Sequence, residues 1–285
     1  MKVELVKGLS RIEQLLYWCR ERESIRLKKE AGEKLPYTDD LIFQSYRFCN
    51  VIRADDKVSR WLQENWYTPN FGHKNMLPAI AMARHFNKIE TLTAIGFPKK
   101  WDLEKIKKIA RDLKASGVAI YSAAYMVRGN SGTDDKVSSV MDYTVQPLVD
   151  NPIIIHTDSM KLTWGELRQR FGFGDFMSGQ CVADLRWAME GTWEDAKDWA
   201  PPGPGSQKGM NRLLGRSIGG HIKEPQFVEE LQDLKKIYAK KLPSKLFNRM
   251  EMIDIQNTLC EFSKYTKTLH FEGRPKQLYN GFGDE

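Results

Sequence analysis

The dominant feature of this sequence is a succession of segments whose apolar residues recur every three or four positions. Residues 9–31 are an example, since Leu15, Leu16 and Cys19 share one face among many charged residues, and the pattern ends near Gly32. Such spacing predicts amphipathic helices rather than strands. Similar patterns cover 39–50, 55–62, 76–87, 102–115, 137–149, 163–170, 176–190, 226–240 and 248–266.

The helical segments predict an all-α fold. We expect one helical unit, with two lobes as an open alternative, because no repeat or Pro/Ser-rich linker divides the 285 residues. Residues 1–37 are interpreted as an N-terminal helical extension and 38–285 as the main domain. Residues 118–136, rich in β-branched and turn residues, are expected to be irregular, with a flexible loop at 129–132.

Composition and motifs exclude several classes of protein. The chain has no run of about 18 apolar residues and no signal-like start, so we expect no membrane span and a cytoplasmic location. The four cysteines are widely spaced and the five histidines form no ligand motif, which predicts free thiols and no metal held by the protein. P-loop, dinucleotide-binding and serine-hydrolase motifs are absent as well. The net charge of +7 is compatible with a polyanionic partner.

A first glycine turn separates the predicted helices 163–170 and 176–190. It contains Gly172, Phe173 and Gly174, the pattern of a helix–hairpin–helix element. Glycines there permit a tight turn whose N–H groups, with the next helix N-terminus, can bind a DNA phosphate. The alternative is an ordinary helix–helix corner.

A second glycine-rich turn follows Pro201 and Pro202. Gly203, Gly205 and Ser206 precede a helix that carries Lys208 and Arg212 in its first turns. Backbone donors, a helix dipole and two cations together predict an anion site. A rigid loop with solvated cations is the alternative.

A polar segment at 46–57 contains Arg47, Asn50 and Arg53, which would share one face if the segment were helical. These arginines either bind a phosphate or pair with Asp55 or Asp56.

Two later segments place ionisable side chains on single helix faces. Gln180 and Asp184 are four residues apart and predict either the floor of a base pocket or a buried pair that braces helices. Glu261, Lys264 and Tyr265 continue a face that begins at Asp254. If partly buried, Glu261 and Lys264 would be suited to proton transfer, whereas on an open surface they would form only a salt bridge.

Five segments together resemble a known family. They are YRFCNVIRADDKVSRWL, AYMV, GFGDFMSGQCVADL, PPGPGSQKGMNRL and LCEFSKY. This combination resembles the α-glutamyl/putrescinyl thymine pyrophosphorylase group and the related helical domain that accompanies 5-hydroxymethyluracil DNA kinases. The resemblance covers roughly residues 38–280. It implies a helix–hairpin–helix DNA glycosylase-like fold and a role in viral hypermodification of thymine.

The resemblance implies a transferase that acts on 5-(pyrophosphoryloxymethyl)uracil in DNA. An amine, from an amino acid or a polyamine, would replace the pyrophosphate on the exocyclic carbon. The implied partners are double-stranded DNA with modified uracil, the amine and a separate 5-hydroxymethyluracil DNA kinase, in a host cytoplasm if the protein is viral. No cofactor held by the protein is implied, although Mg²⁺ could accompany pyrophosphate.

The family pattern falls on particular residues of this sequence. Glu261 and Asp184 are the candidate bases, with Lys264 beside Glu261. The substrate and pyrophosphate would contact Arg47, Asn50, Arg53, Gln180 and Tyr265. DNA would contact the two glycine turns, at Gly172, Phe173, Gly174, Gly203, Gly205, Ser206 and Lys208. Two rival functions stay open, namely a DNA glycosylase for a modified pyrimidine and a non-catalytic DNA-binding module.

Overall fold

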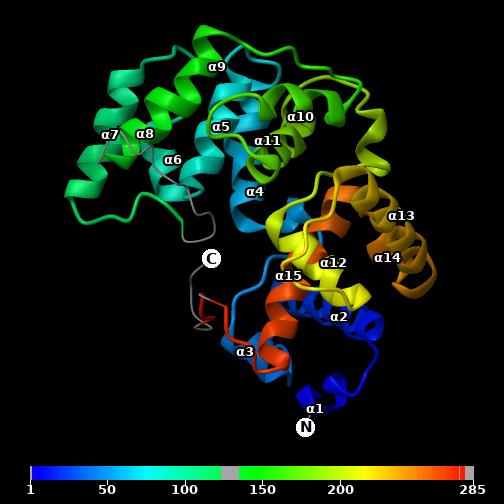
Figure 1. Cartoon of the computed structure of the whole chain (residues 1–285). Helices are drawn as coiled ribbons and strands as arrows, with labels where there is room; N and C mark the ends of the chain where they lie inside the picture. The colour runs from blue at the N-terminus through cyan, green and yellow to red at the C-terminus, as the bar shows by residue number, and fades with distance from the viewer. Residues whose placement is uncertain (1, 123–134, 276, 280–285) are drawn as a thin grey trace. The chain divides into compact units, whose positions relative to one another are not determined.

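The computed structural model describes residues 2–122, 135–275 and 277–279, and all regular elements within them are helical (Figure 1). The single β-type contact in these residues is an isolated antiparallel bridge between Tyr46 and Leu278. The all-α prediction is therefore confirmed. The predicted loop at 129–132 and the AYMV segment at 124–127 lie outside the described residues.

The chain forms two compact units. Unit 1 consists of Met1–Asp56 and Ala196–Glu285, and unit 2 consists of Lys57–Asp195. This division differs from the predicted boundary after residue 37. Helix α2 (Arg11–Glu30) lies inside unit 1, where its Leu15 and Trp18 are completely buried. Residues 1–37 are thus an integral part of a core rather than an appendage.

Unit 1 is built around helix α15 (Met252–Leu269). Twelve of the eighteen residues of α15 are buried, including Phe262 and Tyr265. Helices α2, α12 and α13 pack against it. The helices of this unit are α1 (Lys2–Lys7), α2, α3 (Leu41–Ser45), α12 (Pro204–Leu214), α13 (Glu224–Lys241), α14 (Ser244–Phe247) and α15, with short 3₁₀ turns at Arg53–Asp55 and Glu194–Lys197, the latter beginning in unit 2.

Unit 2 surrounds helix α5 (Met76–Phe86), all of whose residues are buried. A helix that is apolar on every side must be covered on every side, and α6, α9 and α11 cover it. The other helices are α4 (Lys57–Leu62), α6 (Ile89–Ile95), α7 (Leu103–Ala115), α8 (Lys136–Val140), α9 (Gln146–Asp150), α10 (Met160–Arg168) and α11 (Asp175–Ala188). π-helical turns at Gln63–Tyr67 and Met141–Val145 and a 3₁₀ turn at Thr68–Asn70 connect them.

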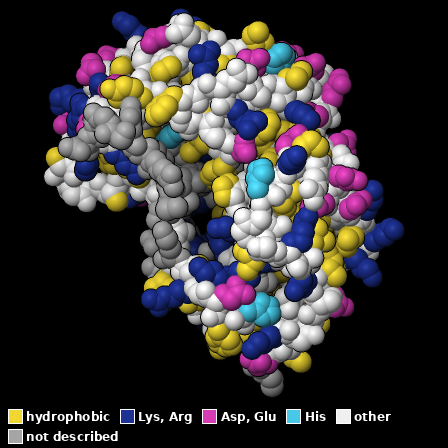
Figure 2. All heavy atoms as spheres, in the orientation of Figure 1, with side chains coloured by type: hydrophobic (Ala, Val, Ile, Leu, Met, Phe, Trp, Pro, Cys, Tyr) yellow, Lys and Arg dark blue, Asp and Glu magenta, His cyan; other side chains and the backbone are white. Residues whose placement is uncertain are grey.

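The surface carries mixed charge. In Figure 2, Lys and Arg side chains on the visible face are interspersed with Asp and Glu. None of the helices in the described residues combines the length and apolar composition of a membrane span. All four cysteines are free thiols, and the described residues contain no group of three His, Cys, Asp or Glu arranged to hold a metal ion.

Candidate functional site

The segment 46–52 is not helical, so the predicted helix across 39–50 is wrong beyond Ser45. Its Arg47 N–H donates to the distant carbonyl of Gln277 (3.2 Å). Three further backbone N–H groups donate to carboxylates: Cys49 to Glu261 Oε2 (3.1 Å), Asn50 to Asp56 Oδ1 (2.7 Å) and Arg53 to Asp254 Oδ1 (2.7 Å). Distant acceptors therefore replace the helical hydrogen bonds at these positions. Arg47, Asn50 and Arg53 do not share a helix face.

Glu261 and Lys264 form the centre of the candidate site in unit 1. Glu261 is 1% exposed, and its Oε1 lies 2.5 Å from Lys264 Nζ. The Lys264 side chain is 44% exposed, so this pair connects a buried carboxylate with the surface. Burial opposes the charge on Lys264, but the surrounding groups, with the carboxylate of Glu261 first among them, together outweigh it and raise the pKa of Lys264. Lys264 is therefore a firmly protonated cation.

Arg22 and Asp56, both half-buried, add a cation and a carboxyl group to this site. Burial raises the pKa of Asp56 to about 6, an effect that the Asn50 N–H and Arg22 partly oppose. Burial also lowers the pKa of Arg22, whose Nε donates to the carbonyls of Phe48 and Cys49. Arg22 Nη1 and Asn50 Oδ1 are buried without a hydrogen-bond partner. Unsatisfied buried atoms of opposite polarity are typical of a place that holds water or ligand.

Helix α12 approaches this site more closely than side chains would normally permit. A Cβ at Gly205 would lie 2.3 Å from Cys260 Sγ, and a Cβ at Gly209 would lie 2.0 Å from the Leu259 carbonyl oxygen. The fully buried Ser206 bonds to Gly203 and receives a hydrogen bond from Gln256. Gly203 and Ser206 are buried in this packing, whereas Gly205 is half-buried, and the predicted contact of this turn with DNA phosphate stays a prediction. Lys208 is exposed, one turn beyond Gly205.

The two thiols at this site are not activated. Burial raises the pKa of Cys49 well above its ordinary value and raises that of Cys260 to about 11. Both therefore stay protonated near neutral pH, and neither is a ready nucleophile.

The other predicted pyrophosphate contacts in unit 1 have different environments. Arg47 is exposed, whereas Arg53 is only 5% exposed. Tyr265 is fully buried and donates a hydrogen bond to Asp40 Oδ2 (2.7 Å), which also accepts one from Tyr17 (2.9 Å). Burial and Asp40 raise the pKa of Tyr265 far above its usual range. The hydroxyl of Tyr265 therefore holds α15 against the start of α3, and its predicted contact with substrate stays a prediction.

Asp184 lies in unit 2 within a buried ion pair. Its carboxylate is 0% exposed and accepts bonds from Arg84 Nε (2.6 Å), Arg84 Nη2 (2.9 Å) and Tyr67 (2.6 Å). A bidentate arginine on an enclosed carboxylate is a structural arrangement. Glu261, the other predicted base, touches the partly exposed side chain of Lys264. Gln180, on the same helix, is 8% exposed.

The first glycine turn does connect two helices, as predicted. Gly172 has φ +82° and leaves no room for a side chain, since a Cβ would lie 2.5 Å from Thr144 Oγ1. Phe173 is 3% exposed and meets the His85 ring edge-on at 5.7 Å. Gly172 and Gly174 themselves are exposed, and Gly174 is the N-cap of α11. This turn, unlike the second, leaves its glycine backbone accessible.

Two arginines at these sites were missed by sequence reasoning. Arg84 forms a buried ion pair with Asp184, and Arg22 bonds to the carbonyls of the 46–56 loop, yet neither arginine belongs to a recognisable motif. Arg22 lies in the run Arg20-Glu21-Arg22-Glu23, in which every residue looks solvated. The buried, apolar character of α5 was the signal for Arg84, because a lone cation inside such a helix requires a carboxylate partner.

Comparisons with known proteins identify relatives of this chain. Residues 10–274 match the family described as 5-hmdU DNA kinase, helical domain. A 5-hmdU DNA kinase of Bacillus phage SP10 is 24% identical over 279 residues. The match covers 86% of this chain and 43% of the phage protein, so the chain spans less than half of that relative's length. No solved structure matches the chain.

Proposed function

This chain belongs to the family of the 5-hmdU DNA kinase helical domain, and from that premise we propose that it acts in the hypermodification of thymine in phage DNA. Its specific reaction is the replacement of the pyrophosphate of 5-(pyrophosphoryloxymethyl)uracil by an amine. The observation that carries this proposal is convergence within unit 1. The 46–56 loop, the start of α12 and the Cys260–Lys264 segment come from distant parts of the sequence and surround Glu261.

The proposed substitution forms one bond, breaks one bond and releases one proton. The amine nitrogen forms a bond to the exocyclic carbon of the base, while the bond from that carbon to the pyrophosphate oxygen breaks with its electron pair. Nitrogen then carries an excess proton, which Glu261 accepts. For this transfer the amine must occupy the position that Lys264 Nζ takes beside Glu261 Oε1. The amine is an amino acid or a polyamine.

The leaving pyrophosphate requires positive charge nearby. Lys264 remains protonated because of Glu261 and reaches the surface, so it can move from the carboxylate to the leaving group. Arg47 and Lys208 are exposed cations on the loop and the helix that border the site. Any Mg²⁺ would arrive with pyrophosphate.

DNA binding is proposed for the first glycine turn of unit 2. Its support is the exposed backbone at Gly172 and Gly174 ahead of α11, whose fourteen residues provide a full helix dipole. Chemistry on a base requires it to leave the stack, which costs a few kcal/mol.

The test is mass spectrometry of nucleosides after incubation of DNA bearing pyrophosphorylated 5-hydroxymethyluracil with the protein and a pool of amines. We expect an aminated nucleoside and one pyrophosphate per product, in strands that survive hot alkali. Glu261→Gln should lower this rate by about two to four powers of ten, whereas Glu229→Gln, an exposed change on α13, should not. Abasic sites would instead identify a glycosylase.

A second candidate function is a non-catalytic DNA-binding module for a separate 5-hydroxymethyluracil DNA kinase. The supporting observation is that the phage kinase has more than half of its length outside the match. This function predicts no new nucleoside, but a gain in kinase activity on DNA when this protein is added. Glu261→Gln would leave that gain unchanged.

A further inference from the structure

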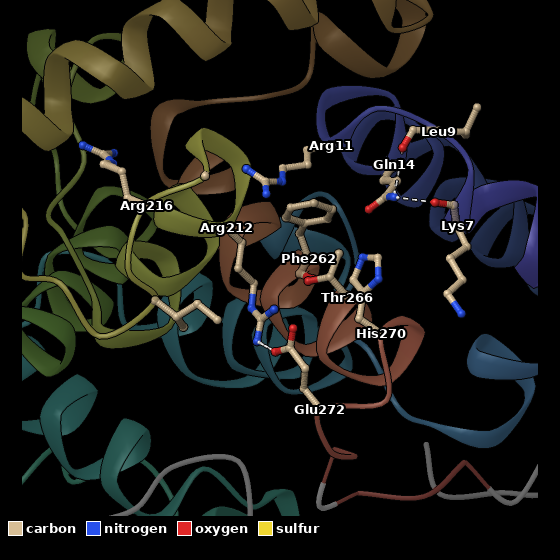
Figure 3. A pocket seen from close by; sticks show the side chains of 12 residues that line it. Lys7, Leu9, Arg11, Gln14, Arg212, Arg216, Phe262, Thr266, His270 and Glu272 are labelled. Carbon is tan, nitrogen blue, oxygen red and sulfur yellow. Dashed lines mark hydrogen bonds and ion pairs between the residues drawn. The ribbon is translucent and has the colours of Figure 1, made fainter.

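A pocket of about 450 Å³ lies in unit 1 beside α15 (Figure 3). Glu261 does not line it. Phe262, Thr266 and His270 follow one another at four-residue intervals and so form one row along α15. The ends of α1, α2 and α12 complete the wall. Leu9, Ile218 and Phe262 give it an apolar part.

The wall is strongly cationic. Lys7, Arg11, Arg212 and Arg216 line the pocket, against the single carboxylate of Glu272. Arg212 pairs with Glu272 and Arg216 with Glu230, which leaves two positive charges uncompensated. Arg11 forms no ion pair or hydrogen bond within the described part of the chain. Its Nη1 lies over Gly215, where a Cβ would approach within 2.2 Å.

Buried polar atoms in the wall also lack partners. Arg212 Nε, Arg216 Nε and Gln14 Oε1 have no hydrogen bond, and Gln14 is only 3% exposed. Two of these three atoms are donors on guanidinium groups. A buried donor without a partner is unfavourable, and an acceptor bound in the pocket would satisfy it.

The pKa of His270, which lines this pocket, is affected by the charges around it. Burial lowers the pKa of His270, and the nearby Arg212, Lys7 and Arg11 lower it further, while Glu272 opposes them. Three cations from separate elements thus act on one point of the wall.

We propose that this pocket binds a small molecule with a pyrophosphate group, as an inorganic anion or as part of a nucleotide. Guanidinium groups suit phosphate oxygens. Arg11 offers a whole guanidinium group to a ligand, and Arg212 and Arg216, although paired with carboxylates, each keep an Nε–H donor without a partner. Its volume is in the range of small-molecule sites, roughly 300–1,000 Å³, and exceeds what one phosphate fills. The pocket is separate from the Glu261 site and is an additional binding site beyond the proposed reaction.

Isothermal titration calorimetry of the full chain with inorganic pyrophosphate, ADP and orthophosphate at matched ionic strength tests this proposal. Pyrophosphate and ADP should bind one to one, and orthophosphate at least tenfold more weakly. Arg11→Gln should weaken pyrophosphate binding by about tenfold, because it removes a charged contact. The exposed Arg11 has no partner in the described fold, so this variant should keep its melting temperature. Lys245→Gln, an exposed change on α14, is the matched control and should bind normally.

Nuclear magnetic resonance gives a second measurement, since an anion beside His270 should raise the pKa of its ring. If pyrophosphate and ADP bind with equal affinity, the pocket recognises the pyrophosphate group alone. If ADP binds more tightly, the ligand is a nucleotide. No saturable binding of either, or equal affinity in wild type and Arg11→Gln, would overturn the proposal. The proposal would also be overturned if Arg11→Gln weakened DNA binding but left pyrophosphate binding unchanged. Glu261→Gln should bind pyrophosphate here normally, which separates this site from the proposed transfer reaction.

Discussion

Three carboxylates in unit 1 carry negative charge at the candidate site and also accept hydrogen bonds from the backbone of the 46–56 loop. Glu261, Asp56 and Asp254 each accept a backbone N–H from that loop. A carboxylate so used fixes the loop even when no substrate is bound. Substitutions at this site therefore need stability measurements beside activity measurements.

Asp56→Asn should change the pH dependence of stability. Since burial raises the pKa of Asp56 from 3.8 to about 6 in the folded protein, the folded state binds the extra proton between these values. Stability from Asp56 is therefore present at low pH and is lost as pH rises through about 6, a loss of the order of 2–3 kcal/mol. Asparagine stays neutral and still accepts the Asn50 N–H. Urea unfolding should show the variant gaining on wild type between pH 4.5 and pH 7.5, and a constant difference would refute this.

Alanine variants of Arg47 and Arg53 should differ in what they change, namely the transfer rate for Arg47 and the stability for Arg53. Arg53→Ala removes a buried cation and should cost about 1–3 kcal/mol of unfolding free energy. Arg47→Ala changes an exposed side chain and should leave stability within about 0.5 kcal/mol, while lowering the proposed transfer rate. Thermal unfolding compared with single-turnover rates distinguishes them. If Arg47→Ala melts early, or keeps the full rate, its proposed role fails.

At the scale of elements, the packing of α12 on α15 depends on two glycines four residues apart. The carbonyl of Leu259 and the thiol of Cys260 occupy the space that side chains at Gly209 and Gly205 would need. Because a backbone carbonyl cannot move without shifting α15, Gly209 is the more restrictive position.

Gly209→Ala should destabilise the protein by about 1–3 kcal/mol through overpacking. Gly165→Ala is the matched control, since Gly165 lies within α10 with no atom within 4 Å of its Cβ position. There the alanine should stabilise by about 0.5–1 kcal/mol. Denaturant unfolding monitored by circular dichroism measures both. Similar effects at the two positions would contradict the packing argument.

Sequence periodicity predicted the long helices well because their apolar faces record burial directly. Residues 102–115 and 176–190, for example, correspond to α7 and α11 within two residues at each end. Periodicity failed over 46–53, where Glu261 and Asp254, more than 200 residues away, bond to the backbone N–H groups of Cys49 and Arg53. For the same reason the sequence did not reveal that Tyr265 and Asp184 are internal braces. Their partners Asp40 and Arg84 are brought to them only by the tertiary fold.

For the whole molecule, the net charge of +7 should govern the affinity for DNA. Each phosphate that the protein neutralises releases counterions, so affinity should fall steeply between about 50 and 200 mM salt. Fluorescence anisotropy with labelled duplex DNA over this range measures the slope. A neutral crowding agent such as dextran should change the affinity for DNA much less than salt does. Absence of binding at low salt, or binding that ignores salt, would contradict every nucleic-acid role proposed above.

The interrupted path of unit 1 has a consequence for the order in which the chain acquires structure during synthesis. Unit 2 is one continuous stretch, so it can fold once residue 195 has left the ribosome. The first 56 residues are made earlier but must wait, because the partner of Asp40 is Tyr265 and that of the Cys49 amide is Glu261. At that stage the growing chain carries a finished second unit, while residues up to 56 still expose the apolar face that the later helices of unit 1 cover. Chaperones and proteases could reach this face until residue 269 has been made.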